Sequence, residues 1–247
     1  MRITNIHGHA DPILRAMEND DYNPGNCDYT ATGLIKPPRI RALEAIHKDE
    51  LEEDLEDGLY RLYGKMMHKL LEQAGDFGNE IKEKRYFMDL EVDGKKYVIS
   101  AQMDLLALVS GRLTDYKFTS AWGYTKGKKA KPEHIQQLNI QKEILKQNDL
   151  EVAELNISAL LRDWSKGMAR TRAAFPERPI VRQELPIWPS QQTLDFMTER
   201  VRMHETAKTE LPQCNNEDMW GDQKRCKDYC PVKNFCTQFQ EQYQSQI

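Results

Sequence analysis

The stretch between residues 84 and 118 constrains the fold most, because it holds two turn signals between segments of strand length. Residues 85–92 alternate between apolar and polar side chains, and the Asp93-Gly94 pair that follows is a strong signal for a two-residue β-hairpin turn. A short apolar run then leads to a second turn signal at Ser110-Gly111. We therefore predict an antiparallel meander of three or four strands.

The second predicted hairpin carries charged residues whose placement has a chemical use. Asp104 is expected near the start of its first strand, with Asp115 and Lys117 near the end of the second and facing the same side. Pairing about the turn brings the two carboxylates close together, where they repel unless a cation such as Mg²⁺ or Mn²⁺ lies between them. Lys117 could then activate a water and offset charge on a phosphate. A plain hairpin with a surface ion pair is the alternative, because Asp-x-Lys is a common tripeptide.

The length and charge of the chain limit the classes of protein it can belong to. Its 247 residues allow one large domain or a domain with an appendage. The net charge of −4 excludes a uniformly basic nucleic-acid-binding surface but not a local basic patch. No apolar run approaches the ~18 residues of a membrane span, and the first residues lack the apolar centre of a signal peptide. We expect a cytoplasmic protein with no membrane partner.

The first part of the chain is predicted to be an irregular arm over residues 1–30, followed by helices. Pro37-Pro38 suits the first turn of a helix, and apolar residues continue with roughly helical spacing to Leu62, with the acidic run 49–57 on a solvated helix face. A further helix is expected to end near Gly75. Within it His68 shares a face with Gly64, four residues earlier. A lone helical histidine is usually a surface or packed residue. His68 becomes a candidate site residue only if this helix packs beside Asp104 and Asp115.

Two basic segments follow the second hairpin. Trp122 and Tyr124 precede a lysine-rich loop, and aromatic rings can stack on bases while lysines contact phosphates. A mobile solvated loop is the alternative. The later segment 162–178 is a second candidate for contacts to a nucleic-acid backbone. The residues concerned are Lys126, Lys128, Lys129 and Lys131 in the loop, and Trp164, Arg170 and Arg172 in the later segment.

The region between and after these segments predicts a strand on either side of a helix. Residues 132–148 form an amphipathic helix with Gln137 and Gln141 on one face, available for hydrogen bonds to nucleic acid or simply exposed. Residues 151–161 then read as a strand, and strand–helix–strand order implies a parallel crossover and a mixed sheet. A last strand at 179–187 and a helix at 191–209 complete the predicted core.

The C-terminal segment contains four of the five cysteines. Eleven, three and five residues separate Cys214, Cys226, Cys230 and Cys236. Four thiolates at such spacings can hold tetrahedral zinc or an iron–sulfur cluster, with free buried thiols as the alternative. We therefore divide the chain into the arm 1–30, a core 31–210 and a cysteine-rich metal-binding segment 211–247.

Four short motifs occur in an order that resembles the RecB-like branch of the PD-(D/E)XK nuclease superfamily. The motifs are Gly64-Lys-Met-Met-His68, Asp104, Asp115-Tyr116-Lys117 and Gln137-Leu-Asn-Ile-Gln141. The family has G-x-x-x-H on a helix, Asp on a strand, D/E-x-K on the next strand and Q-x-x-x-Y on a helix. The resemblance covers residues 30–236. It implies an α/β (α+β) fold with a restriction-endonuclease-like core, in which helices flank a mixed central β-sheet.

The resemblance also implies roles for these residues. His68, Asp104, Asp115 and the carbonyl of Tyr116 would bind Mg²⁺ or Mn²⁺. Lys117 would be the catalytic lysine, and Gln137 would contact DNA or position the substrate. Gln141 stands where the family commonly has tyrosine, so its contact with DNA is in doubt.

The cysteines are similar to those of the iron–sulfur members of this group, the CRISPR-associated adaptation nucleases and the AddB-type helicase–nucleases. Those proteins have one cysteine before the core and three at the C-terminus. Here the segment Thr-Gly-Leu-Ile-Lys-Pro-Pro-Arg ending at Arg39 has a proline at the position of the early cysteine. We expect a 4Fe–4S cluster with Cys214 as the fourth ligand. Cys27 is the alternative ligand, and zinc is the alternative metal.

The implied function is that of a metal-dependent deoxyribonuclease, an exonuclease acting on single-stranded DNA or DNA with a free end. Its place would be recombination, repair or phage DNA processing, because a compact chain without a helicase motif resembles phage or mobile-element nucleases. A phage-encoded protein would act in the nucleoid or host cytoplasm. Two alternatives stay open: a DNA-binding adaptor with a catalytically silent nuclease fold, and an RNA-processing nuclease of the same fold. The sequence does not predict the oligomeric state.

Overall fold

The computed structural model describes residues 2–19, 22–75 and 78–244, and the chain divides into two compact units. The sheet unit comprises residues 24–32 and 61–197. The cysteine unit comprises residues 1–23, 33–60 and 198–247. The chain passes between them four times, once between Asn23 and Pro24 and three times inside helices, which are α2 (Ala31–Ile35), α4 (Leu59–Gln73) and α7 (Ser190–Thr206). This division differs from the expected one, because the C-terminal cysteine segment shares a unit with the N-terminal residues.

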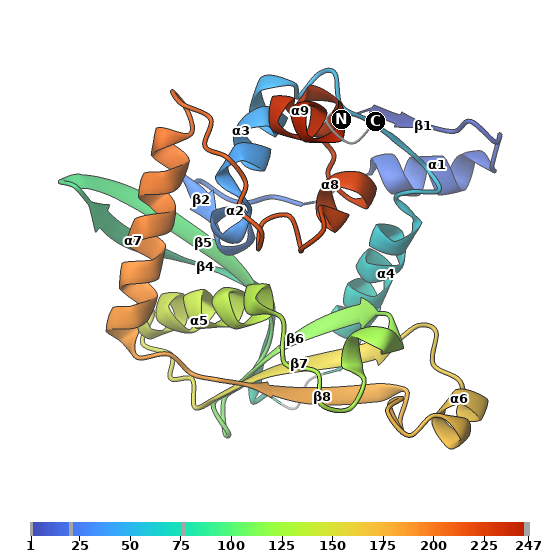
Figure 1. Ribbon diagram of the computed structural model, residues 1–247. Coiled ribbons are helices and arrows are strands. Elements are labelled where there is room, and N and C mark those ends of the chain that lie inside the picture. The colour runs from blue at the N-terminus through green and yellow to red at the C-terminus, as the bar shows by residue number, and fades with distance from the viewer. Residues whose placement is uncertain (1, 20–21, 76–77, 245–247) are drawn as a thin grey trace. The chain divides into compact units, whose positions relative to one another are not determined.

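A six-stranded mixed sheet forms the centre of the sheet unit (Figure 1). Its strands are β2 (Tyr29–Thr30), β4 (Glu80–Val92), β5 (Lys95–Ala107), β6 (Arg112–Thr119), β7 (Glu154–Leu161) and β8 (Ile180–Leu185). β5 is antiparallel to β4 and β6 and parallel to β2. β7 runs parallel to β6 and antiparallel to β8. The predicted mixed α/β class and the parallel crossover are therefore confirmed.

Both predicted hairpin turns are present. Asp93 and Gly94 join β4 to β5 with φ angles of 53° and 75°, the left-handed conformation that a two-residue hairpin turn requires. Gly111, before β6, has φ 63°, and a Cβ at this position would lie 3.0 Å from the backbone nitrogen of Ala153. One expectation was wrong: β5 is a single long strand, so Asp104 lies near its end rather than near the start of a short strand.

Helix α5 (Pro132–Gln147) forms the crossover between β6 and β7 and packs against β4, β5, β6 and β7. Pro132 occupies its first turn, where a missing N–H costs nothing. Leu138, Ile144 and Leu145 are fully buried, and each such side chain contributes about 1.5–3 kcal/mol. The shorter elements η1 (Ala121–Tyr124) and α6 (Lys166–Thr171) complete the described part of this unit.

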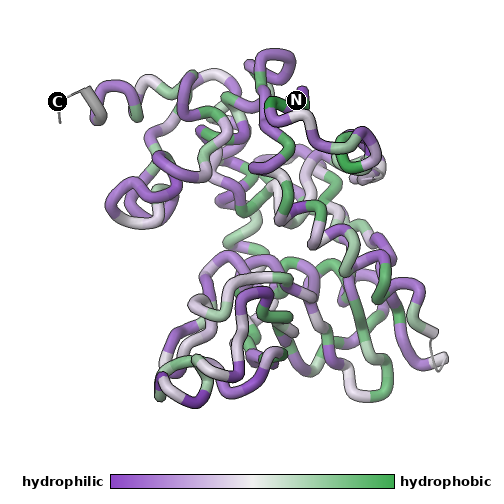
Figure 2. The backbone as a smooth tube through the Cα atoms, turned by 90° about the vertical axis from the view of Figure 1, so that its right-hand side faces the viewer, coloured by the Kyte–Doolittle hydropathy of each residue, from purple (hydrophilic) through white to green (hydrophobic). Residues whose placement is uncertain are grey.

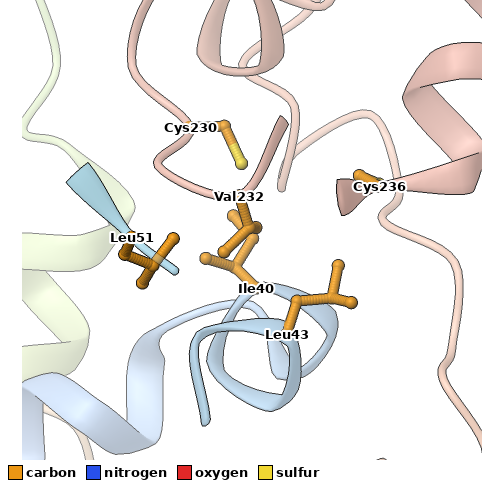
Figure 3. Close-up of a cluster of buried hydrophobic side chains, with 6 residues drawn as sticks. All are labelled: Ile40, Leu43, Leu51, Cys230, Val232 and Cys236. Carbon is orange, nitrogen blue, oxygen red and sulfur yellow. The ribbon is translucent and has the colours of Figure 1, made fainter. Parts of the chain in front are cut away.

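The cysteine unit combines N-terminal and C-terminal elements around a small apolar core. Figure 3 shows Ile40, Leu43, Leu51, Cys230, Val232 and Cys236 gathered in this core. Its described elements are β1 (Arg2–Thr4), α1 (Asp11–Glu18), α3 (Pro38–Ile46), β3 (Glu52–Asp54), α8 (Lys224–Asp228), η2 (Lys233–Phe235) and α9 (Thr237–Gln244).

Two expectations for the N-terminal residues were wrong, and one pairing explains both. Residues 1–30 are not an irregular arm, because β1 pairs with β3 in a parallel two-stranded sheet and α1 follows it. The acidic run 49–57 is not a helix face, because α3 ends at Ile46 and β3 lies within the run. Leu51 and Leu55 are four residues apart, which mimics helical spacing, but each is buried beside β3. Local spacing carries no information about the distant partner strand.

Figure 2 shows hydrophilic and hydrophobic residues interspersed along the traced chain. Among the residues that the structure describes, none of the helices joins the length and the apolar character that crossing a bilayer demands.

Candidate functional site

Three elements of the sheet unit bring a histidine and two carboxylates together. His68 lies on α4, Glu83 on β4 and Asp104 on β5, and one ligand atom from each lies within 4.8 Å of the other two. The Nδ1 atom of His68 is 3.0 Å from Glu83 Oε1 and 3.8 Å from Asp104 Oδ2. The expectation that the helix of His68 packs beside Asp104 is therefore confirmed.

Glu83 is the residue that sequence reasoning missed. The β4–β5 ladder pairs Lys82 with Leu105 and Lys84 with Met103, but it is interrupted where Glu83 faces Asp104. Glu83 has φ 45°, a left-handed conformation that is costly for a residue with a side chain and is often found at functional sites. Its Oε2 atom accepts a hydrogen bond of 2.7 Å from Gln102 Nε2. The strained backbone of Glu83 marks this position as a candidate functional site. A cation bound between Glu83 and Asp104 would relieve the repulsion between their carboxylates.

The pKa of Asp104 reflects this crowding. Burial and the nearby charge of Asp115 raise it to about 7, although His68, the backbone N–H of Tyr116 and Lys117 act in the opposite direction. The Tyr116 N–H donates to Asp104 Oδ2 at 2.7 Å. The pKa of His68 is raised, chiefly by its hydrogen bond to Glu83. Both shifts favour the protonated forms of Asp104 and His68, and a divalent cation bound here would compete with those protons.

Asp115 and Lys117 form a second group beside the first. Asp115 is 2% exposed, and its Oδ1 atom accepts a hydrogen bond of 2.8 Å from Gln137 Nε2 on α5. Its Oδ2 atom forms an ion pair of 2.7 Å with Lys117 Nζ. Asp115 is thus not one of the three clustered ligands, and a cation beside it would share this oxygen with Lys117. The predicted role of the Tyr116 carbonyl stays a prediction.

Gln141 does not face solvent, contrary to the expectation that it contacts DNA. It is 3% exposed, and its Nε2 atom donates to the carbonyl of Gln102 at 3.1 Å. Gln137 and Gln141 share a helix face as predicted, but that face covers the sheet. Spacing along a helix tells which residues share a face, not which face is buried.

Several of the predicted DNA-contacting residues are engaged within the sheet unit. Lys126 pairs with Glu177 at 2.7 Å, and Lys128 Nζ donates to the Trp122 carbonyl. Arg172 lies over the Trp122 ring, with its guanidinium carbon 5.3 Å from the ring centroid. The Trp164 indole N–H donates to the carbonyl of Pro176. Lys129, Lys131 and Arg170 are exposed. Their contacts with DNA stay a prediction.

In the cysteine unit, four cysteines line one cavity. They are Cys214, Cys226, Cys230 and Cys236, and Arg39 and Gln238 also line it. Gln238 fixes Cys214 from both sides, because its Oε1 accepts from the Cys214 N–H at 2.8 Å and its Nε2 donates to the Cys214 carbonyl at 2.9 Å. Cys27 belongs to the sheet unit, where its sulfur accepts from Ser100 Oγ at 3.2 Å. Of the two candidates for fourth ligand, Cys214 is the one that lines the cavity.

Burial disfavours the thiolate form of three of these cysteines. Burial raises the pKa of Cys214 to about 12 and also raises the pKa of Cys226 and of Cys230. Among the described residues, no three cysteine sulfurs lie within 4.8 Å of one another. Tetrahedral zinc with Zn–S bonds of about 2.3 Å would bring its four sulfurs to roughly 3.8 Å from one another. The sulfur atoms are therefore more widely spaced than a single zinc ion requires.

Comparison with known proteins yields a likeness in fold alone. The chain matches no family model and no curated protein. A solved structure described as "Crystal structure of SSO0001" superposes with a TM-score of 0.58 at 18% sequence identity, over 91% of this chain and 94% of that chain.

Proposed function

We propose that this chain is a metal-dependent deoxyribonuclease of the RecB-like branch of the PD-(D/E)XK superfamily, with a restriction-endonuclease-like core in the sheet unit. One observation carries the proposal. A helical histidine, His68, converges with Asp104 on one strand, and the Asp115–Lys117 pair lies on the adjacent strand. Asp104, Asp115 and Lys117 come from one hairpin, whereas His68 comes from a helix that precedes it by more than thirty residues, so its arrival beside Asp104 is the informative contact.

The residues present fit a divalent cation. Asp104 and Asp115 repel each other in a buried site, and a carboxylate oxygen of Glu83 lies within 4.8 Å of ligand atoms of Asp104 and His68. Carboxylate oxygens and imidazole nitrogen suit Mg²⁺ or Mn²⁺. His68, Glu83 and Asp104 would hold the ion, with Asp115 and the Tyr116 carbonyl as further candidates. The bound ion would supply Lewis acidity toward a phosphate oxygen and lower the pKa of a water.

The chain's own groups position and stabilise the substrate. Lys117 would donate to the phosphate as negative charge develops there, and Asp115 orients its ammonium by the 2.7 Å ion pair. Gln137 holds Asp115 in place from α5, and the Tyr116 N–H holds Asp104. These contacts fix the reacting groups before substrate arrives, which is how preorganised sites lower a barrier.

The substrate is proposed to be DNA, single-stranded or with a free end, degraded as by an exonuclease. The exposed lysines Lys129 and Lys131 and the Trp122–Arg172 pair support contacts to a nucleic-acid backbone and bases. The process served would be recombination, repair or phage DNA processing. A silent DNA-binding adaptor and an RNA-processing nuclease are the two alternative functions.

The cysteine unit is proposed to hold a 4Fe–4S cluster, with zinc as the alternative. The lining of one cavity by Cys214, Cys226, Cys230 and Cys236 supports a metal centre. The cavity lining is compatible with either centre, and the resemblance of the cysteine pattern to the iron–sulfur members of the group is what favours the cluster.

The test is cleavage of end-labelled DNA with Mg²⁺ or Mn²⁺ by the wild type, Asp115→Asn and Lys117→Met. Glu80→Gln serves as a matched control, because Glu80 is an acidic residue of the same sheet outside the three clustered ligands. Loss of one charge-stabilising group typically lowers kcat about 10²–10³-fold, and we expect at least that for both variants. Full cleavage by a folded Asp115→Asn protein overturns the proposal. Binding without cleavage by the wild type favours the adaptor, and cleavage of RNA alone favours the RNA nuclease.

A further inference from the structure

Arg39 is a buried cation in the cysteine unit. It is 6% exposed and lies on α3. Its guanidinium donates to four acceptors, which are Cys236 Sγ at 3.2 Å, the carbonyls of Leu211 at 3.4 Å and Pro212 at 3.2 Å, and Thr237 Oγ1 at 2.9 Å. None of these four acceptors is a carboxylate, so the charge of Arg39 is not neutralised by them.

A buried guanidinium without an anionic partner is costly, because desolvation of a charge exceeds what neutral acceptors return. Arg39 lines the same cavity as the four cysteines, and its Nε atom points at one of their sulfurs. A thiol sulfur is a weak acceptor, whereas a thiolate forms a stronger, charge-assisted hydrogen bond. Asp218 also lines the cavity, but among the described residues no carboxylate forms an ion pair with Arg39. A centre bound by four thiolates carries net negative charge and would supply that anionic partner.

Arg39 also joins the two ends of the cysteine segment. Pro212 lies two residues before Cys214, and Thr237 directly follows Cys236. Through these contacts one side chain fixes the approach to the first ligand and the position of the last. Gln238 links the same two places from α9, because it brackets the backbone of Cys214. Arg39 therefore contacts a proposed metal ligand, Cys236, and also holds the backbone on either side of the cysteine segment.

We propose that Arg39 is the charge-compensating donor of the cysteine site, and that its hydrogen bond to the Cys236 thiolate raises the reduction potential of the bound cluster. This inference rests on the proposed cluster. A hydrogen bond and a positive charge at a ligand sulfur stabilise the more negatively charged, reduced form, and such contacts are among the main determinants of cluster potentials.

The experiment compares anaerobically purified wild type, Arg39→Lys and Arg39→Met, all as the full chain. Arg200 supplies a matched control, because it is a largely buried arginine of the same unit whose Nε and terminal nitrogen donate to the carbonyls of Leu34 and Lys36 and to no cysteine. Each protein is analysed for iron and sulfide content and for thermal stability. The reduction potential is then measured by titration monitored by visible and electron paramagnetic resonance spectroscopy.

We expect Arg39→Met to shift the potential to more negative values, Arg39→Lys to shift it less, and Arg200→Met to leave it unchanged even if it lowers thermal stability. An unchanged potential in Arg39→Met with full iron and sulfide overturns the proposal. If Arg39→Met does not fold, Arg39→Gln, prepared in the same way, decides, because glutamine removes the charge but keeps an amide donor. A potential in Arg39→Gln equal to that of the wild type, at full iron and sulfide content, then overturns the proposal.

The iron and sulfide content of the wild type tests the proposed cluster independently of Arg39. If the wild type holds zinc instead, the cluster is wrong, and the role of Arg39 is read from the rate of zinc release to a chelator. Faster release from Arg39→Met than from Arg200→Met supports charge compensation. Equal rates contradict it.

Discussion

The two candidate metal sites are built on opposite principles. In the sheet unit, the pairing of β4 with β5 and the helix α4 position His68, Glu83 and Asp104, and none of these three residues belongs to the buried apolar core. In the cysteine unit, Cys230 and Cys236 are themselves members of the small apolar core. The first site is a charged cluster on a unit whose folding we expect not to depend on a bound metal. The second is part of what holds its unit together.

This difference has a thermodynamic consequence. A cluster of repelling carboxylates destabilises the sheet unit until a cation binds, but the sheet and α5 supply stability of their own. The cysteine unit buries few large apolar side chains, so a metal there contributes to its folding free energy directly. Removal of the metal should therefore unfold the cysteine unit and leave the sheet unit folded.

The largest expected effect concerns the fourth cysteine ligand. Cys214→Ser should lose the metal and lower the stability of the cysteine unit by on the order of 5 kcal/mol or more, because structural metal binding is folding energy. Metal analysis and limited proteolysis provide the measurement, with the sheet unit expected to resist cleavage. Cys27→Ser is the matched control and should keep the full metal content. The reverse outcome, with Cys27 required and Cys214 dispensable, contradicts the assignment.

The next effect is a pH dependence in the sheet unit. Since the folded pKa of Asp104 is about 7 against an ordinary value of 3.8, the stability contributed by its protonated form is lost as pH rises toward and through 7. On the proposed binding of Mg²⁺, the ion would compete with this proton, so it should stabilise the protein more at pH 8 than at pH 5.5, by about 2 kcal/mol. Thermal melts with and without Mg²⁺ at both pH values give the result.

Two aspartates separate this linkage from general charge effects. Asp104→Asn should remove most of the pH dependence of the Mg²⁺ effect. Asp89→Asn, on the same hairpin and paired with Lys96, should leave it unchanged. An Mg²⁺ effect that is equal at both pH values in the wild type would show that Asp104 does not exchange its proton for the ion.

A smaller effect tests the turn that brings Asp104 and Asp115 together. Gly111→Ala should destabilise the sheet unit by about 2 kcal/mol, because the left-handed φ is costly and the added Cβ would lie 3.0 Å from the Ala153 nitrogen. Gly94→Ala has a similar φ of 75° but open space around the new atom, so about 1 kcal/mol is expected. Urea unfolding of both variants measures the difference, and equal losses would mean that the close approach to Ala153 is unimportant.

The smallest expected effect tests whether the proposed DNA binding involves the sheet unit. Replacing Lys129 and Lys131 by alanine should weaken DNA binding several-fold and reduce the slope of log affinity against log salt by about 1 for each phosphate that is no longer neutralised. Lys227→Ala, in the cysteine unit, is the control and should change neither quantity. Binding titrations at several salt concentrations provide the test, and equal weakening by Lys227→Ala would spread the interface over both units.

Features with local signals were predictable from the sequence. The turns at Asp93-Gly94 and Ser110-Gly111 require residues that adopt a left-handed backbone, and glycine marks both positions. The start of α5 at Pro132 and its apolar positions follow from composition and period. The convergence of His68 with Asp104 is expected only through the resemblance, because nothing local places that helix on the sheet.

Features that depend on distant pairing could not be predicted in the same way. Counting outward from Asp93-Gly94 does pair Glu83 with Asp104, but in sequence Glu83 looks like one charge in a charged run. The strand β3 has helical spacing in sequence, and β1, the partner that makes it a strand, is about fifty residues away. The spacing of Gln141 gives a helix face without telling which side the sheet covers.

Anomalous diffraction from crystals soaked in Mn²⁺ tests most directly whether His68, Glu83 and Asp104 hold one divalent cation. We expect a single strong peak bounded by these three side chains, absent in Glu83→Gln and retained in Glu80→Gln. A peak elsewhere in the sheet unit, or none at saturating Mn²⁺, contradicts the proposed site.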